Sequence, residues 1–146
     1  MTYFRATDPF PLESADDTGL HEFYTRLSER RLVTTSCGRC GRVAWPPRRF
    51  CPECVCDEFR WVELPQEGLV HGFTIQEAGL PEGFAASQVF AIVKVDAARI
   101  FAPIIGPQAA TVHIGARVRL SPVRVADDAK GRPRYVVAFD LGEAPG

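Results

Sequence analysis

Three features are absent from this sequence: a long apolar run, a large excess of charge of one sign, and an apolar segment in the first residues. No stretch of its 146 residues approaches the length that crosses a bilayer, so a membrane span is not expected. A formal net charge of −1 argues against a general affinity for polyanions. The first five residues lead into acidic sequence without an apolar segment, which is unlike a signal peptide and predicts a cytoplasmic protein.

The chain also lacks the familiar motifs of self-sufficient enzymes. It contains no Gly-x-Ser-x-Gly elbow, phosphate-binding loop, dinucleotide fingerprint or His-Glu-x-x-His helix. Its three histidines, His21, His71 and His113, have no neighbour that suggests a general base, and a surface or core role suits each of them better. A dispersed catalytic site stays open as an alternative, but these absences favour a protein that does not catalyse a reaction alone.

What the chain does contain is two Cys-x-x-Cys pairs. Cys37 and Cys40 form the first pair, Cys51 and Cys54 form the second, and ten residues separate them. Each pair lets a tight turn direct two sulfurs at one ion, and together they complete a tetrahedral shell that suits Zn²⁺ or, less often, iron. Disulfides are the alternative, but cytosolic thiols stay reduced, which favours a metal. Four thiolates leave no open coordination position, so the predicted metal is structural.

Other residues near the pairs have less specific interpretations. Cys56 is either a spare ligand or a buried, idle thiol, and the second interpretation is favoured. Trp45, Phe50 and Trp61 are expected to cover the metal site, because a small ribbon has little core of its own. Residues 26–60 carry eight arginines against four acids. Arginine suits phosphate and carboxylate recognition, and it suits plain solvated surface equally well.

The spacing of apolar residues predicts one helix and a series of strands. The helix is expected to begin at Asp17 or Thr18 and to end at about residue 30 or 31. β-rich runs follow at residues 32–35, 43–45, 59–62, 69–75, 88–95, 99–105, 116–125 and 135–141. The last five runs predict a small closed barrel, for which the five-stranded OB-fold is the leading candidate and an open sandwich the alternative. The barrel's Phe73, Phe90 and Phe101 are expected to fill its core.

The longest connection of the predicted barrel, residues 77–87, carries Leu80 and Phe84 between glycines. These side chains either plug the end of the barrel or contact a partner or an acyl ligand. The N-terminal 25 residues carry one base against five acids, and no role is assigned to this acidic tail.

Several of these motifs together resemble a known family. They are Cys37-x-x-Cys40-Gly41, Pro46-Pro47-Arg48, Cys51-Pro52-x-Cys54, the strand around Trp61, Gly68-x-Val70 and Gly115-x-x-Val118. The family consists of accessory proteins that couple a rubredoxin-like zinc ribbon to a C-terminal OB-fold, and the similarity covers about residues 20–140. The fold expected from it is mainly β: an N-terminal tail and helix over residues 1–31, the zinc ribbon over 32–64, and the OB-fold domain over 65–146.

The resemblance also implies a function. Members of that family are partners of thiolases and related acyl-CoA enzymes, including hydratases and aldolases. This chain is therefore expected to be a non-catalytic accessory subunit of a hetero-oligomer, which stabilises its catalytic partner and helps to bind acyl-CoA. The four cysteines carry over as zinc ligands. Arg48 and Arg49 are suggested as CoA contacts, because arginine suits phosphates, and Leu80 and Phe84 as partner contacts.

Two other classes of function stay open. Zinc ribbons and OB-folds both occur in nucleic-acid-binding modules, although a near-balanced charge and phenylalanines in the core would argue against that interpretation. A rubredoxin-like electron carrier would hold iron at the four cysteines and would be coloured.

Overall fold

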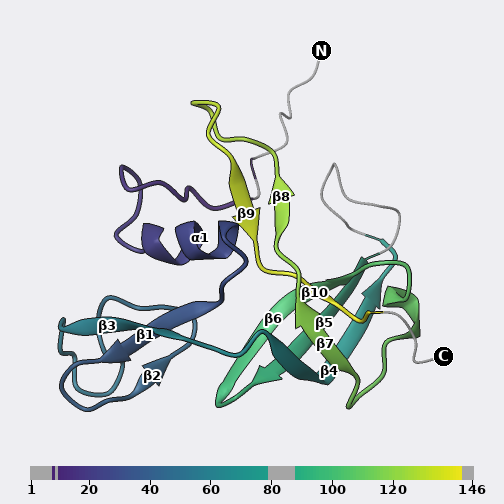
Figure 1. The fold of residues 1–146 in the computed structure, drawn as a ribbon, viewed down its shortest axis with the longest axis horizontal. Coiled ribbons are helices and arrows are strands. Elements are labelled where there is room, and N and C mark those ends of the chain that lie inside the picture. The colour runs from purple at the N-terminus through teal and green to yellow at the C-terminus, as the bar shows by residue number, and fades with distance from the viewer. Residues whose placement is uncertain (1–7, 9, 79–87, 143–146) are drawn as a thin grey trace.

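The computed structural model describes residues 8, 10–78 and 88–142. Figure 1 shows a small sheet on one side, a barrel on the other, and a helix with a two-stranded hairpin above them. The elements are α1 (His21–Ser28), β1 (Val33–Cys37), β2 (Val43–Ala44), β3 (Phe59–Glu63), β4 (Glu67–Gln76), β5 (Gln88–Val95), β6 (Ala98–Ile105), the 3₁₀ turn η1 (Ala109–Thr111), β7 (Arg117–Leu120), β8 (Val123–Val125), β9 (Arg134–Val136) and β10 (Phe139–Asp140). Within the described residues, no helix is both long and apolar enough to cross a membrane.

Helix α1 is shorter than the sequence pattern predicts. Before it, the backbone N–H of Thr18 donates to the carbonyl of Ser14, which closes a separate turn. After it, Arg30 takes a left-handed φ of 63°, and the N–H of Arg31 donates to the carbonyl of Arg26, as in a Schellman cap. The predicted helix is therefore wrong at both ends, because a turn precedes it and a cap closes it early.

In the ribbon sheet, β1 lies between β2 and β3 and pairs antiparallel with both. All five residues of β1 are buried, although Thr34, Thr35 and Ser36 carry hydroxyl groups. The hydroxyl of Thr34 donates to the carbonyl of Ala44, and that of Thr35 accepts the backbone N–H of Arg48 at 2.8 Å. The centre of the ribbon is thus polar, and its hydroxyls hold the neighbouring loop in place.

The second half closes into a barrel with the strand order β10-β6-β5-β4-β7, which confirms the predicted five-stranded barrel. Strand β10 completes the closure, because it pairs parallel with β6 and antiparallel with β7. Branched and small side chains dominate the core on the barrel strands: Val70, Val89, Ala91, Val93, Val95, Ile100, Ala102, Ile104, Val118, Leu120 and Phe139.

Two of the predicted runs divide differently from the sequence expectation. Val123–Val125 and Arg134–Val136 leave the barrel and pair with each other as the β8–β9 hairpin. The chain turns out of the barrel at Ser121-Pro122, and among the later described strands the short β10 returns to it. The run 135–141 is therefore two strands in two different sheets.

The expectation that three phenylalanines fill the barrel is wrong. Phe73 is 42% exposed and Phe101 is 67% exposed, while Phe90 is half-buried. Side chains alternate along a strand, and Val89 and Ala91 occupy the interior of β5 while Ile100 and Ala102 occupy that of β6. Phe90 and Phe101 therefore lie on the outer face, whereas Phe73 is opposite the inward-facing Ala91 but remains partly exposed.

The acidic N-terminal segment is tied to the β8–β9 hairpin. Arg132 bonds to the carboxylates of Asp16 (3.0 Å) and Asp17 (3.1 Å). Arg134, which is only 2% exposed, reaches Asp8 at 2.8 Å. Because α1 packs against β9, these ion pairs hold the N-terminal segment, the helix and the hairpin together. The charge imbalance of the first 25 residues is thus matched by arginines far away in the sequence.

Candidate metal centre

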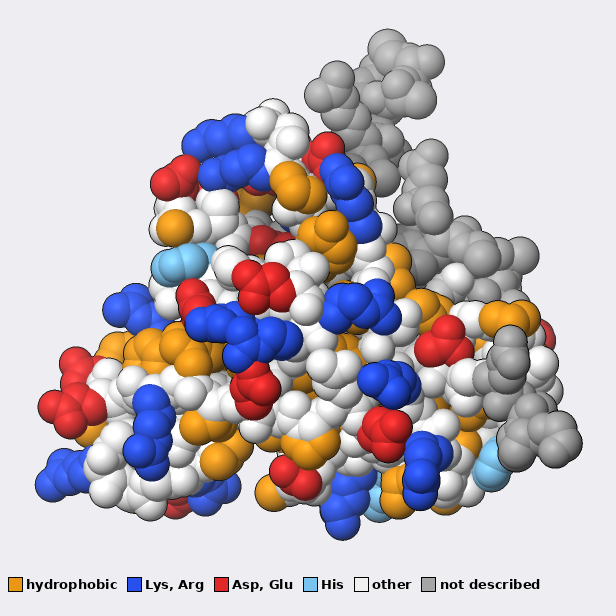
Figure 2. Space-filling model, viewed as in Figure 1, with side chains coloured by type: hydrophobic (Ala, Val, Ile, Leu, Met, Phe, Trp, Pro, Cys, Tyr) orange, Lys and Arg blue, Asp and Glu red, His pale blue; other side chains and the backbone are white. Residues whose placement is uncertain are grey.

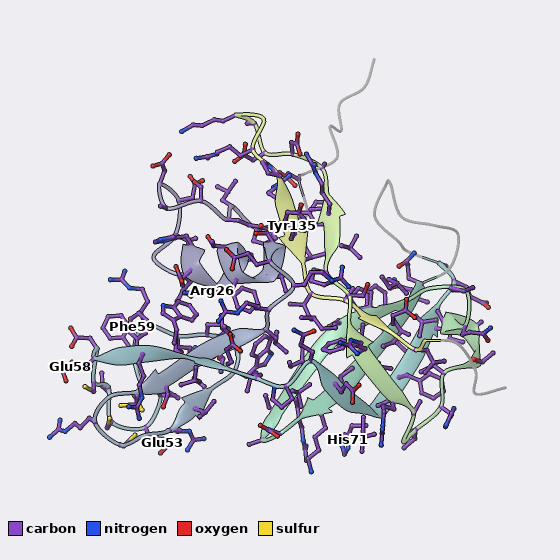
Figure 3. The ribbon with its side chains drawn as sticks, in the orientation of Figure 1. Arg26, Glu53, Glu58, Phe59, His71 and Tyr135 are labelled. Carbon is purple, nitrogen blue, oxygen red and sulfur yellow. The ribbon has the colours of Figure 1, made fainter. Side chains whose placement is uncertain are left out.

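The ribbon brings the four predicted cysteines together at one end. The sulfurs of Cys37, Cys40, Cys51 and Cys54 all lie within 4.8 Å of one another, with Cys37 3.6 Å from Cys54 and Cys40 3.5 Å from Cys51. Figure 3 shows the sulfurs beside Glu53, far from His71 on the barrel. Within the described part of the chain, no other group of three or more His, Cys, Asp or Glu side chains has such geometry.

The two turns that carry the cysteines repeat the same backbone hydrogen bonds. In the first, Gly41 N–H donates to the carbonyl of Cys37 at 3.0 Å, and Cys37 N–H donates to the carbonyl of Arg42 at 2.8 Å. In the second, Val55 N–H donates to Cys51 at 3.0 Å, and Cys51 N–H donates to Cys56 at 2.9 Å. The residue after the second cysteine is left-handed in both turns, with φ of 77° at Gly41 and 61° at Val55.

This repeat explains Cys56. It stands where Arg42 stands in the first turn, and its carbonyl closes the second turn. Its half-buried thiol is not part of the four-sulfur group. Cys56 therefore contributes main-chain geometry, and its side chain is outside the candidate metal centre.

Backbone amides also prepare the sulfurs electrostatically. The N–H groups of Cys40 and Arg39 lie 3.4 and 3.3 Å from the Cys37 sulfur and lower the pKa of that thiol to about 6. In the second turn, the N–H of Cys54 lowers the pKa of Cys51 in the same way. Metals bind thiolate, so each turn presents its first cysteine in the form that a metal ion requires.

The four sulfurs fit a tetrahedral ion. Zn–S bonds of about 2.3 Å place the sulfurs of a tetrahedron about 3.8 Å apart, close to the two separations of 3.5 and 3.6 Å seen here. All four positions of such a shell are taken by protein, so a bound zinc would have no position for water or substrate. This arrangement suits a structural metal, and iron would find the same ligands.

Of the three aromatic residues expected to cover the metal site, Phe50 lies beside two of the cysteines, whereas Trp61 packs edge-on against Phe59, with ring centroids 5.9 Å apart. Phe50 and Phe59 line a small hollow with Cys37 and Cys51, and Phe50 is 58% exposed. Trp45 packs edge-on against Phe23 of α1, with ring centroids 5.8 Å apart. The expectation misplaced Trp45, which joins the ribbon to the helix.

Of the other candidate residues, Arg48 lines the same small hollow as Cys37 and Cys51. Arg48 and Arg49 have exposed side chains in the loop between the two cysteine turns, and neither forms a salt bridge with a described acidic residue. The side chain of Arg49 lies against Gly19, before α1. Leu80 and Phe84 lie outside the described residues.

A group of apolar residues that the sequence pattern did not single out lies at the junction of the ribbon, the helix and the barrel. Leu20, Phe23, Trp45, Pro47 and Phe101, with their neighbours, line a groove of about 430 Å³. The alternation of residues in β5 and β6 could have revealed this group. The interior positions are taken by Val89, Ala91, Ile100 and Ala102, which places Phe101 on the outer face.

Known proteins match both halves of the chain. A family profile described as the ChsH2 rubredoxin-like zinc ribbon domain matches residues 25–55, and one described as the ChsH2 C-terminal OB-fold domain matches residues 61–123. A protein of Methanocaldococcus jannaschii, named a DUF35 domain-containing scaffold protein, is 31% identical over 101 residues. That match covers 66% of this chain and 71% of the relative. The chain belongs to the DUF35 family.

Two solved structures share the DUF35 fold. The one described as an Ltp2-ChsH2(DUF35) aldolase has a TM-score of 0.68 at 23% identity, and the match covers 82% of this chain and 91% of that one. A DUF35 protein of unknown function from Sulfolobus solfataricus has a TM-score of 0.57 at 18% identity, over 88% of this chain and 90% of that one. At these identities the matches establish the fold, which is the predicted zinc ribbon followed by an OB-fold barrel.

Proposed function

We propose that this DUF35 chain is a non-catalytic accessory subunit of an acyl-CoA-processing enzyme, of thiolase type or a related hydratase or aldolase. The observation that carries the proposal is the structural match to a DUF35 chain described together with an aldolase. The relative named a scaffold protein supports it. The closed four-sulfur group supports it too, because a metal held there has no position for substrate.

The metal part of the proposal is that Cys37, Cys40, Cys51 and Cys54 ligate a structural zinc ion. The ribbon has a polar central strand, and the free energy of metal binding would then help to fold it. We further propose that residues 32–64 form the zinc ribbon and residues 65–146 the OB-fold domain, with residues 1–31 as a tail and helix.

Contacts to the acyl-CoA remain part of the proposal. Arg48 and Arg49 are candidates to bind the phosphates of CoA, because their guanidinium groups are exposed and have no acidic partner among the described residues. Leu80 and Phe84 remain candidates for contacts with the catalytic partner.

A second candidate function is the binding of single-stranded nucleic acid. Phe90 and Phe101 stack on the outer face of β5 and β6, with ring centroids 5.5 Å apart, and OB-folds bind oligonucleotides on the face of their second and third strands. The charge distribution favours the first candidate. Figure 2 shows acidic and uncharged side chains between the basic ones, without a continuous basic track on the face in view.

Affinity purification from the native host tests the proposed function. The tagged full-length chain is recovered with and without nuclease treatment, and co-eluting proteins are identified by mass spectrometry. We expect a thiolase, hydratase or aldolase in stoichiometric amount, resistant to nuclease. Recovery of nucleic acid with no such enzyme, at any salt concentration, would establish the second candidate instead.

A further inference from the structure

One outer face of the barrel is apolar although it is exposed. In β5 and β6, the residues that point away from the barrel interior pair across the strands as Phe90 with Pro103, Ile92 with Phe101, and Lys94 with Arg99. Phe101 is 67% exposed and Ile92 is 38% exposed. The outer side of an antiparallel sheet is normally polar, so an apolar outer face that the described residues leave exposed suits contact with another molecule. We name these six residues the β5–β6 face.

The aromatic members of this face are already arranged as a platform. The rings of Phe90 and Phe101 are nearly parallel, at 7°, with centroids 5.5 Å apart. On the neighbouring strand, Leu69 is opposite Lys94 and is 48% exposed, which extends the apolar surface onto β4. An ordered, exposed platform of this kind suits the apolar side chains of another molecule.

One end of the face carries two positive charges that oppose each other. Lys94 and Arg99 are direct cross-strand partners, and like charges in that position destabilise a sheet. Neither forms a salt bridge with an acidic residue of the described chain, whereas Arg26, Arg42 and Arg132 all do. An anionic group from outside the chain would relieve this repulsion.

The other edge of the face leads into the groove described above. Phe101 belongs to both, and beyond it the groove is lined by Leu20, Phe23, Trp45 and Pro47. None of the described residues that line this groove is charged. A molecule lying on the face would therefore meet positive charge at Lys94 and Arg99, apolar surface beside them, and, next to Phe101, an apolar groove of about 430 Å³.

We propose that the β5–β6 face and this groove dock a segment of the catalytic partner that has apolar side chains followed by carboxylates. This inference rests on the proposed function and specifies the surface through which the subunit would act. The carboxylates would pair with Lys94 and Arg99, and the apolar side chains would cover Phe101 and enter the groove.

A protein segment fits these observations better than single-stranded nucleic acid. A nucleic-acid strand needs basic groups along its whole backbone, and here they stop at one end of the face. The uncharged groove beyond Phe101 offers nothing to phosphates. Ile92 and Pro103 also interrupt the aromatic surface, which suits aliphatic side chains of a protein.

The decisive variant is Lys94→Glu. The new carboxylate would be opposite Arg99, so the repulsion becomes a cross-strand ion pair and Tm rises by about 1–2 °C. The same change weakens the partner's binding about tenfold, because a carboxylate of the partner now meets a carboxylate. A variant that has a higher Tm but a lower affinity shows that the loss of binding is not caused by loss of folding. Arg60→Glu, at an exposed arginine of β3 in the ribbon sheet, is the matched control and leaves the affinity within about twofold.

A second variant tests the apolar part. Phe101→Ala removes an exposed ring, so the fold and the zinc content are kept, while the affinity falls about 30-fold, as for a residue at the centre of an interface. Phe73→Ala is the control, because it removes another partly exposed ring, which is opposite Ala91 and does not lie on the β5–β6 face.

Binding is measured with the full-length chain, the acyl-CoA enzyme subunit recovered with the wild-type chain, and a thymidine oligonucleotide. Loss of enzyme binding in both face variants, with both controls unaffected, supports the inference. Unchanged enzyme binding in the face variants overturns the inference and leaves the proposed function standing. Recovery of no acyl-CoA enzyme by the wild-type chain overturns both. Oligonucleotide binding that the face variants abolish assigns the face to nucleic acid and overturns the inference.

Discussion

The two halves of this chain are stabilised by different means. The barrel has an interior of apolar side chains from its strands, and their burial is sufficient reason for it to fold. The ribbon has at its centre the buried hydroxyls of Thr34, Thr35 and Ser36, and two of its buried apolar residues, Cys37 and Cys51, belong to the sulfur group. A metal ion bound by the four cysteines would therefore stabilise the ribbon in the way that the apolar interior stabilises the barrel.

The halves are nevertheless joined. Phe23 and Leu27 of α1 belong to the same buried cluster as the barrel residues, and Trp45 of the ribbon packs on Phe23. The ribbon residues Leu32 and Val33 belong to this cluster as well, whereas the buried cysteines Cys37 and Cys51 lie outside it. Perturbations aimed at one half should leave the other half largely folded.

Removal of the metal should have the largest effect. Cys40→Ser deletes one of four ligands, and structural zinc contributes on the order of 10 kcal/mol to the folding of small ribbons. We expect zinc to be lost and the amides of β1 and β3 to lose protection from hydrogen exchange, while β5 and β6 keep theirs.

Cys56→Ser is the matched control for that experiment. Its thiol lies outside the sulfur group, so zinc content and the protection of β1 should be unchanged. Hydrogen-exchange mass spectrometry of both variants, with and without a chelator, decides the matter. If the ribbon amides of the Cys40→Ser chain stay protected from hydrogen exchange without metal, the ribbon does not depend on a metal ion for its stability.

The reverse perturbation is Gly68→Ala in the barrel. A Cβ at this position would lie 2.6 Å from a methyl of Val93 and 2.7 Å from the carbonyl of Lys94, so β4 and β5 must separate. We expect a loss of about 3 kcal/mol of barrel stability, measured by denaturant unfolding, with zinc still bound. Gly72→Ala is the control on the same strand, because nothing lies within 4 Å of its Cβ. Equal losses in the two variants would contradict this explanation.

The local parts of the structure could be predicted from the sequence. Each cysteine turn is formed by hydrogen bonds within six residues, so the spacing alone specifies that its two sulfurs converge. The alternation of β5 and β6 likewise predicts two strands with one buried face. The resemblance to the accessory-protein family added the join between the ribbon and the OB-fold, which the family profiles confirm.

The remaining features depend on partners far apart in the chain. Whether Val123–Val125 joins the barrel depends on β9, with which it pairs instead. Asp8 and Arg134 are 126 residues apart, and no local pattern links them. The phenylalanines were misplaced because apolar character alone does not say which face of a strand points inward, and here smaller residues fill the interior.

A smaller effect should come from exchanging the residues that end the two cysteine turns. Val55 is β-branched, 74% exposed and held at φ 61°, a conformation that glycine adopts without strain. Val55→Gly should therefore stabilise the zinc-bound ribbon by about 1 kcal/mol, equivalent to about fivefold in zinc affinity.

The first turn provides the mirror experiment. Gly41 has φ 77° and no atom within 4 Å of a Cβ, so Gly41→Val introduces the backbone strain without a clash. It should lower zinc affinity by about the same factor that Val55→Gly raises it. Chelator competition measures both. If both changes lower the zinc affinity, then side-chain contacts rather than backbone conformation determine how tightly the two turns bind zinc.

The smallest effect concerns two buried carboxylates where the N-terminal segment meets the β8–β9 hairpin. One oxygen of Glu13 accepts the N–H of Tyr135, and the other has no hydrogen-bond partner among the described residues. Burial raises the pKa of Glu13 above its usual 4.5. In Asp128, by contrast, both oxygens accept hydrogen bonds, and the backbone N–H of Arg132 is the main cause of its lowered pKa.

The two groups should therefore respond to pH with opposite signs. A raised folded-state pKa means that the contribution of Glu13 is complete below pH of about 4.5 and is lost as pH rises through the folded pKa. Glu13→Gln removes that loss and should stabilise the chain at neutral pH by about 0.5 kcal/mol. Asp128→Asn should destabilise it there, with the difference disappearing as pH falls through the lowered pKa of Asp128. Thermal unfolding across this range measures both, and a Glu13→Gln variant less stable than the wild type at neutral pH would show that its buried oxygen is already satisfied.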